Sequence, residues 1–143
     1  MRETIDDFFS AASGNKLEDV DVGGKKIQIL GSAALIAFVG HDGLMDFRYS
    51  KSISKKDDGP RDVFILACAS KNYFADTLHR TGANPVLWTT NLMAPEAYIL
   101  HETIEGWLRH EDGKQIRERA AVVYARYQKI SVRSAEGLFA SGW

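Results

Sequence analysis

Two continuous apolar segments constrain the fold of this 143-residue chain more than any other feature. They are SAALIAFV, residues 32–39, and DVFILACA, residues 62–69. A strand with one solvated face alternates apolar and polar residues, whereas a strand covered on both faces is apolar along most of its length. We therefore expect both segments to be strands of a parallel sheet that helices cover on both sides.

Helical patterns around these strands predict the covering layers. Residues 70–82 begin at a Ser70 N-cap and end at Gly82, and residues 114–130 carry apolar side chains at steps of three and four. Further helices are predicted over residues 4–12 and 94–113, a third strand over 84–91 and a hairpin over 17–30. This alternation predicts an α/β three-layer sandwich with a mostly parallel sheet, in which residues 1–143 form a single domain.

Composition narrows the class of protein. The net charge of −1 gives no general basicity, so we expect no nucleic-acid partner. Cys68 is the only cysteine, which excludes an internal disulfide and fits a reducing compartment. Asp6 and Asp7 stand where a signal peptide is apolar, and no apolar run approaches the roughly 20 residues that span a bilayer. The expectation is a cytoplasmic protein without membrane contact.

Each of the two apolar segments ends in a chemically reactive residue type. His41 follows the first strand and Cys68 lies at the end of the second, just before a helix. Ligands of open parallel sheets bind at the carboxyl ends of the strands, and a helix N-terminus favours a thiolate there. A nearby histidine can move protons to and from a leaving group. If the two strands are neighbours, Cys68 is a candidate nucleophile and His41 its acid–base partner.

The motifs AFVGHDG and VFILACAS, in this order, resemble the caspase-like cysteine peptidases, including gingipain and CHAT-type members. The resemblance covers the central half of the chain. It implies a caspase-like fold, a catalytic pair of His41 and Cys68, and an oxyanion site formed by backbone N–H groups of Gly43 and Cys68. It also implies a peptide or protein substrate, no cofactor and no metal. The segments VGHDGLMDF, LACASKNYF and TTNLMAPEAY are similar to bacterial proteins as well.

The expected substrate-binding residues are Asp42, Thr90, Asn91 and Glu96. In the caspase-like family, the region after the third strand lines the substrate pocket. Turn chemistry explains Asn91 equally well, and the helix dipole explains Glu96. Asp42 separates His41 from Gly43, whereas the family places His and Gly side by side. The His-Asp pair also resembles the metal-dependent HD phosphohydrolases, but these need an upstream histidine and His41 is the first in this chain.

A second hypothesis is a non-catalytic caspase-like scaffold or protein-interaction module. The family fold opens on a strand, whereas this chain opens on a helix. Either the sheet lacks its usual first strand, or the chain is the later part of a longer parent. An uncovered sheet edge would pair with a strand from a partner or from a second copy in a homodimer. Cys68 would then be a packing residue, as free cysteines often are.

Overall fold

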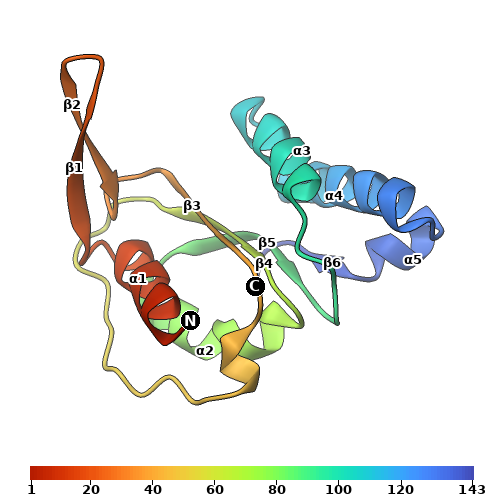
Figure 1. The fold of residues 1–143 in the computed structure, drawn as a ribbon, viewed down its shortest axis with the longest axis horizontal. Coiled ribbons are helices and arrows are strands. Elements are labelled where there is room, and N and C mark those ends of the chain that lie inside the picture. Colours follow the sequence, from red (N-terminus) through yellow and green to blue (C-terminus); the bar gives the residue numbers. More distant parts are fainter.

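The computed structural model describes residues 1–143 as a mixed α/β protein with helices on both faces of a four-stranded sheet (Figure 1). The helices are α1 (Arg2–Ala12), η1 (Gly43–Met45, a 3₁₀ turn), α2 (Ser70–Thr81), α3 (Ala97–Leu108), α4 (Gly113–Gln128) and α5 (Val132–Glu136). The strands are β1 (Leu17–Val22), β2 (Lys25–Leu30), β3 (Leu35–Val39), β4 (Asp62–Leu66), β5 (Asn84–Thr89) and β6 (Phe139–Ala140).

The main sheet has the strand order β3-β4-β5-β6. Strands β3, β4 and β5 run parallel, and the two-residue strand β6 pairs with β5 in the antiparallel sense. The prediction of an α/β protein with a mostly parallel sheet is therefore confirmed. The carboxyl ends of β3, β4 and β5 lie at the same end of the sheet. Ligands of open parallel sheets bind at this end.

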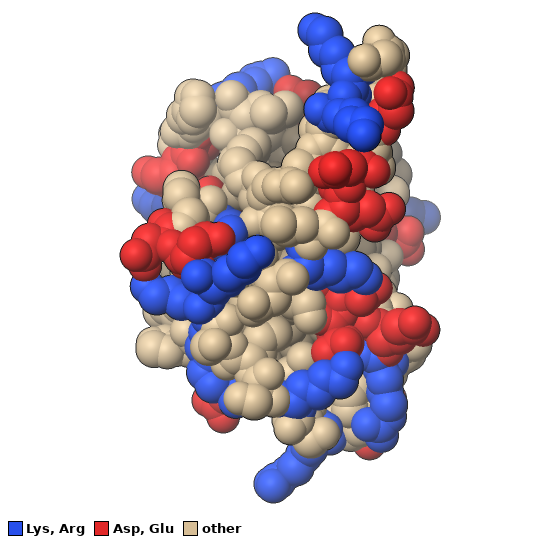
Figure 2. Space-filling model, turned by 90° about the vertical axis from the view of Figure 1, so that its left-hand side faces the viewer, with Lys and Arg blue, Asp and Glu red and all other residues tan.

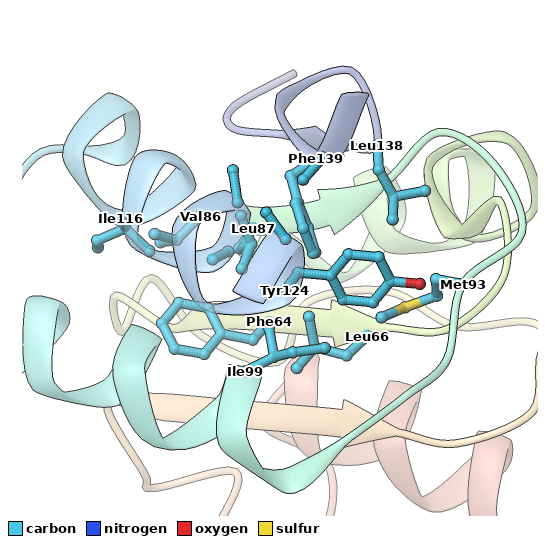
Figure 3. Packing of buried hydrophobic residues seen from close by; sticks show 14 residues of the cluster. Phe64, Leu66, Val86, Leu87, Met93, Ile99, Ile116, Tyr124, Leu138 and Phe139 are labelled. Atoms are coloured by element: carbon cyan, nitrogen blue, oxygen red, sulfur yellow. The ribbon is translucent and has the colours of Figure 1, made fainter. Parts of the chain in front are cut away.

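Strand β4 divides the hydrophobic core into two clusters. Its side chains Phe64 and Leu66 lie in the cluster beneath α3, α4 and α5, part of which is drawn in Figure 3. Val63 and Ile65 lie in the other cluster, beneath α1 and α2. Successive strand residues point to opposite faces, so a strand that serves two cores must be apolar at every position.

Strand β3 departs from the expectation of burial on both faces. It is the edge strand of the sheet, and its Val39 is 39% exposed while Ala37 is also exposed. Phe38 is buried because it points toward α1 and α2. The prediction of burial on both faces was correct for β4 and wrong for the face of β3 that carries Ala37 and Val39. An apolar sequence does not reveal which strand becomes the edge of the sheet.

Two helix details also differ from the predictions. Ser70 is the first residue of α2 rather than its cap, which is Ala69 in the left-handed region at a φ of 47°. Tyr127, one of the side chains spaced at three and four along α4 that the amphipathic pattern assigns to the apolar face, is 57% exposed and stacks on Tyr98 of α3 with ring centroids 4.1 Å apart. Helix α5 and strand β6 were not predicted, because both are too short to carry a periodic signal.

The predicted hairpin of β1 and β2 is present and projects from the body of the protein (Figure 1). Its base is anchored by Arg61, a buried side chain whose Nε donates to the carbonyl oxygen of Gly31. Figure 2 views the protein from this side and shows basic and acidic side chains interspersed. None of the helices combines the length and the apolar character needed to cross a membrane.

Phe74 of α2 is predicted to be the main stabilising residue of the α1/α2 side. Its ring lies 5.4 Å from that of Phe38 and 5.9 Å from that of Phe8, so it joins α2 to β3 and α1. Phe74→Ala should lower the free energy of unfolding by about 3–5 kcal/mol in urea denaturation. The adjacent Tyr73 is 42% exposed, and Tyr73→Ala should cost less than about 1 kcal/mol. Equal losses in the two variants would contradict this packing.

Candidate active site

His41 and Cys68 leave the sheet at equivalent positions of neighbouring parallel strands. Val39 pairs with Leu66 in the register, and the N–H of Gly40 donates to the carbonyl oxygen of Leu66 over 3.2 Å. His41 lies two residues beyond Val39, and Cys68 lies two residues beyond Leu66. Both residues therefore follow the carboxyl ends of adjacent strands, which lie about 4.8 Å apart, and each side chain has its own contacts beyond the strand end.

The turn that carries Cys68 is held by two buried hydroxyl groups. Ser70 Oγ donates to the carbonyl oxygen of Ile65 over 2.8 Å and accepts from the N–H of Thr89 over 3.0 Å. Thr89 Oγ1 donates to the carbonyl oxygen of Ala67 and accepts from the N–H of Ser70. These bonds satisfy backbone groups that the sheet ladder and the helix leave unpaired, so they define the path of the chain around Cys68.

The thiol of Cys68 is half-buried and has two backbone neighbours. The N–H of Met93 donates to Sγ, and Sγ lies at the same 3.4 Å from the carbonyl oxygen of Met93, to which it can donate. The residue packs against the cluster beneath α3 and α4. Its own backbone N–H makes no hydrogen bond within the protein. The thiol is therefore neither sealed in the core nor free of structural contacts.

His41 is an exposed side chain paired with a carboxylate. Its Nε2 lies 2.9 Å from Oδ2 of Asp46, and the two side chains are 53% and 66% exposed. Gly40 precedes it at a φ of +156°, a conformation that residues with a Cβ rarely adopt. The glycine thus lets the chain turn out of β3 immediately before His41. Because Nε2 is paired with Asp46, Nδ1 is the ring nitrogen that remains available for other hydrogen bonds.

Asp42 has a structural role that the sequence did not predict. The residue is fully buried, and its Oδ1 accepts from the N–H of Leu44 over 2.9 Å, which caps η1. Its Oδ2 has no hydrogen-bond partner. Burial raises the pKa of this carboxyl, although the bond from Leu44 opposes the rise. Because the side chain is not accessible, the structure does not place Asp42 where a substrate could touch it.

Gly43 lies on the α1 side of the sheet. A Cβ added to it would meet the side chains of Met1 and Ile5. Its N–H makes no hydrogen bond within the protein, like that of Cys68. However, η1 packs against α2, whereas the Cys68 side chain packs toward α3 and α4. The two residues predicted to form the oxyanion site therefore lean to opposite sides of the sheet.

The other predicted substrate-binding residues have different surroundings. Thr90 Oγ1 donates to the carbonyl oxygens of Gly137 and Leu138, so this hydroxyl joins β5 to the segment before β6. Asn91 is exposed, and its carbonyl oxygen accepts from the N–H of Ala69, next to Cys68. Glu96 is exposed at the N-cap position of α3 and its side chain makes no capping bond. Of the three, Asn91 lies nearest to the candidate nucleophile.

The main hollows of the surface do not contain the pair itself. None of the five best-formed hollows is lined by His41 or Cys68. The largest, about 620 Å³, lies at the opposite end of the sheet beside Asp62 and Asn84. Another, about 470 Å³, is lined by Asn91 and lies at the same sheet end as Cys68. No group of three or more histidine, cysteine or acidic side chains is placed to hold a metal ion.

Two neighbours of His41 and Cys68, the residues Asp46 and Met93, were not predicted as site residues. Asp46 lies five residues after His41, and a carboxylate at that spacing in a loop has no defined geometry. Met93 lies 25 positions from Cys68, and only the return of the chain after β5 brings it to the thiol.

Comparison with known proteins adds no assignment, since no family model, curated protein or solved structure matches this chain. The chemistry that the site could support is therefore inferred from its geometry. A half-buried thiol, an imidazole held by a carboxylate and a free backbone N–H occupy one edge of a parallel sheet. A thiol can serve as a nucleophile, an imidazole as a proton carrier and a free backbone N–H as an oxyanion donor.

The buried carboxyl of Asp42 makes a testable contribution to pH-dependent stability. Its folded-state pKa lies above the ordinary value of 3.8, so the folded state binds the proton more tightly than the unfolded state. Stability therefore falls as pH rises from the unfolded-state pKa through the folded-state pKa. Asp42→Asn keeps an oxygen for the N–H of Leu44 but lacks this titration. The free energy of unfolding of this variant, relative to that of wild type, should therefore increase as the pH rises above about 4.

The control is Asp76→Asn, which changes an exposed carboxylate without a hydrogen-bond partner on α2. Its stability should keep a constant difference from wild type across the same pH range, as measured by urea denaturation at each pH. If Asp42→Asn also keeps a constant difference, the carboxyl is not perturbed by its burial.

Proposed function

We propose that this protein is a cysteine-dependent peptidase or amide hydrolase with Cys68 as nucleophile and His41 as general acid and base. The observation that carries the proposal is the placement of both residues two positions beyond paired residues of adjacent parallel strands. The resemblance of these two motifs to caspase-like peptidases supports the same assignment. The substrate would be a peptide or protein, and the reaction needs no cofactor.

The groups that take part in the reaction all lie beyond the carboxyl ends of β3 and β4. His41 accepts the proton of the Cys68 thiol, and the thiolate attacks the carbonyl carbon of the scissile amide. The unpaired N–H of Cys68 donates to the developing oxyanion. As the C–N bond breaks, His41 returns the proton to the leaving amine. Water, deprotonated by His41, then cleaves the thioester and restores the thiol.

Two contacts support these roles. The N–H of Met93 donates to Sγ over 3.4 Å and so fixes the position of the thiol beyond the end of β4. Asp46 holds the His41 ring through Nε2, which leaves Nδ1 for the proton transfer. A free thiol nucleophile persists in reducing compartments, so we further propose that the protein acts in the cytoplasm.

The proposal predicts that Cys68 reactivity depends on His41. Iodoacetamide should alkylate wild-type Cys68 at pH 7 at least roughly tenfold faster than it alkylates the thiol of His41→Ala, because the imidazole no longer accepts the proton. The rate is measured by intact-protein mass spectrometry. The matched control is His101→Ala, which removes an exposed histidine on α3 and should leave the rate unchanged.

Peptide electrophiles provide the second arm of this test. A peptide with a thiol-directed warhead should modify wild type but not Cys68→Ala, whose fold is checked by circular dichroism. A thiol that reacts slowly and at the same rate with and without His41 would mean that Cys68 is structural, and the hydrolase proposal would be abandoned.

An alternative function is favoured by the free edge of β3. This edge has no strand beside it, and its residues Ala37 and Val39 are exposed apolar side chains. A non-catalytic interaction module would use this edge to pair with a strand of a partner or of a second copy. It predicts a dimer in size-exclusion chromatography with light scattering, converted to monomer by Val39→Lys. A wild-type monomer whose mass Val39→Lys does not change excludes the homodimer.

A further inference from the structure

The hairpin of β1 and β2 forms an arm whose two faces differ in chemistry. Residues that are directly opposite in paired strands lie on the same face of the ribbon. On one face, Asp19 Oδ1 accepts from Gln28 Nε2 over 3.2 Å, and Asp21 pairs with Lys26 in the register. The other face, which we call the apolar face of the arm, carries four apolar side chains: Val20, Val22, Ile27 and Ile29.

The apolar face of the arm is largely uncovered. Val22 is 56% exposed and Ile27 is 46% exposed, and none of the four side chains belongs to either core cluster. The arm projects from the body (Figure 1), and neither of its strands packs extensively against a helix or another strand. A two-stranded ribbon is only marginally stable by itself in water, and exposed apolar surface of this kind is typical of interaction sites.

The arm is held in a defined shape at both ends. Gly23 and Gly24 have φ of +62° and +81°, as the favoured two-residue hairpin turn requires, and the N–H of Gly24 donates to Asp21 Oδ1 over 2.9 Å. At the base, the N–H of Gly31 donates to the carbonyl oxygen of Lys16 over 2.8 Å. A partner would therefore meet a preformed surface, which lowers the entropic cost of binding.

Opposite charges lie at the two ends of the apolar face. Glu18, paired with Ile29, lies on this face at the base, and Lys25, paired with Val22, lies on it at the tip. The two are about 13 Å apart along the arm, since four residues of strand separate their register positions. Neither side chain forms an ion pair within the chain.

This charge distribution fits a second copy of the same arm in one orientation. When two arms stack face to face and antiparallel, the base of each lies over the tip of the other. Glu18 of each copy then lies beside Lys25 of the other, across a sheet separation of about 10 Å that these two side chains can span together. A parallel stack would instead place Glu18 beside Glu18 and Lys25 beside Lys25.

We propose that the apolar face of the arm binds the same face of a second copy of this chain, with the two arms antiparallel about a two-fold axis. The contact is small, because each arm consists of two six-residue strands, so the dimer forms in roughly the micromolar range or above. A net charge of only −1 gives little repulsion between copies. The interface is independent of the proposed hydrolase and differs from the free edge of β3.

The experiment measures the dimer dissociation constant by sedimentation equilibrium between about 1 µM and about 500 µM. Glu18→Lys and Lys25→Glu should each raise this constant roughly tenfold, because each variant places like charges together at two symmetry-related positions. The double variant restores both pairs with the net charge of wild type, and it should regain the wild-type constant. The matched control is Lys129→Glu, which makes the same charge change on an exposed residue after α4 and should have no effect.

Ile27→Thr tests the apolar part of the contact. Threonine keeps a β-branched side chain, so the strand is retained while apolar surface at the centre of the arm is lost, and the dissociation constant should rise roughly tenfold.

Three results would overturn the proposal. The first is a wild type that stays monomeric at every concentration. The second is a dimer that the single charge reversals leave unchanged or that the double variant does not restore. The third is a dimer that Val39→Lys abolishes and the arm variants do not, which would assign the contact to the edge of β3. The alkylation rate of Cys68 should be the same in all arm variants, so the hydrolase is tested separately.

Discussion

Burial of strand β4 on both faces is the constraint on which the rest of the structure depends. Phe64 and Leu66 complete one core and Val63 and Ile65 complete the other, so α1 and α2 can pack only on one face and α3, α4 and α5 only on the other. A strand in this position has its backbone paired on both sides. Its carboxyl end is consequently a rigid point from which a side chain can be positioned accurately.

The chain leaves that point through a turn whose geometry is set by Ser70 and Thr89. Their hydroxyls satisfy backbone groups of both strands and of α2, and they tie the end of β4 to the end of β5. The segment after β5 is held in turn, because the carbonyl of Asn91 accepts from Ala69. The proposed nucleophile and its Met93 contact are thus parts of one connected arrangement. His41 follows β3 on an exposed loop, where its imidazole pairs with Asp46.

Sequence reasoning was most successful where the pattern was long and the burial complete. Three elements formed where expected: strand β4, helix α2 that ends at Gly82, and the hairpin predicted over residues 17–30. It was least successful where a role depends on a partner distant in the chain. Asp42 was expected to contact substrate but caps η1 in a buried position, and Tyr127 stacks on Tyr98 instead of entering the core. The sequence around an aspartate that follows a histidine does not show whether the carboxylate is exposed or buried.

The order of apolar segments was sufficient to predict a mostly parallel α/β sheet, because local hydrophobic patterns determine which segments become strands and where they end. Tertiary structure alone decided that β3 is an edge strand, that β3 and β4 are neighbours with Val39 paired to Leu66, and that Met93 contacts the thiol. These relations join residues far apart along the chain. They follow from how the layers pack as a whole, which no local segment encodes.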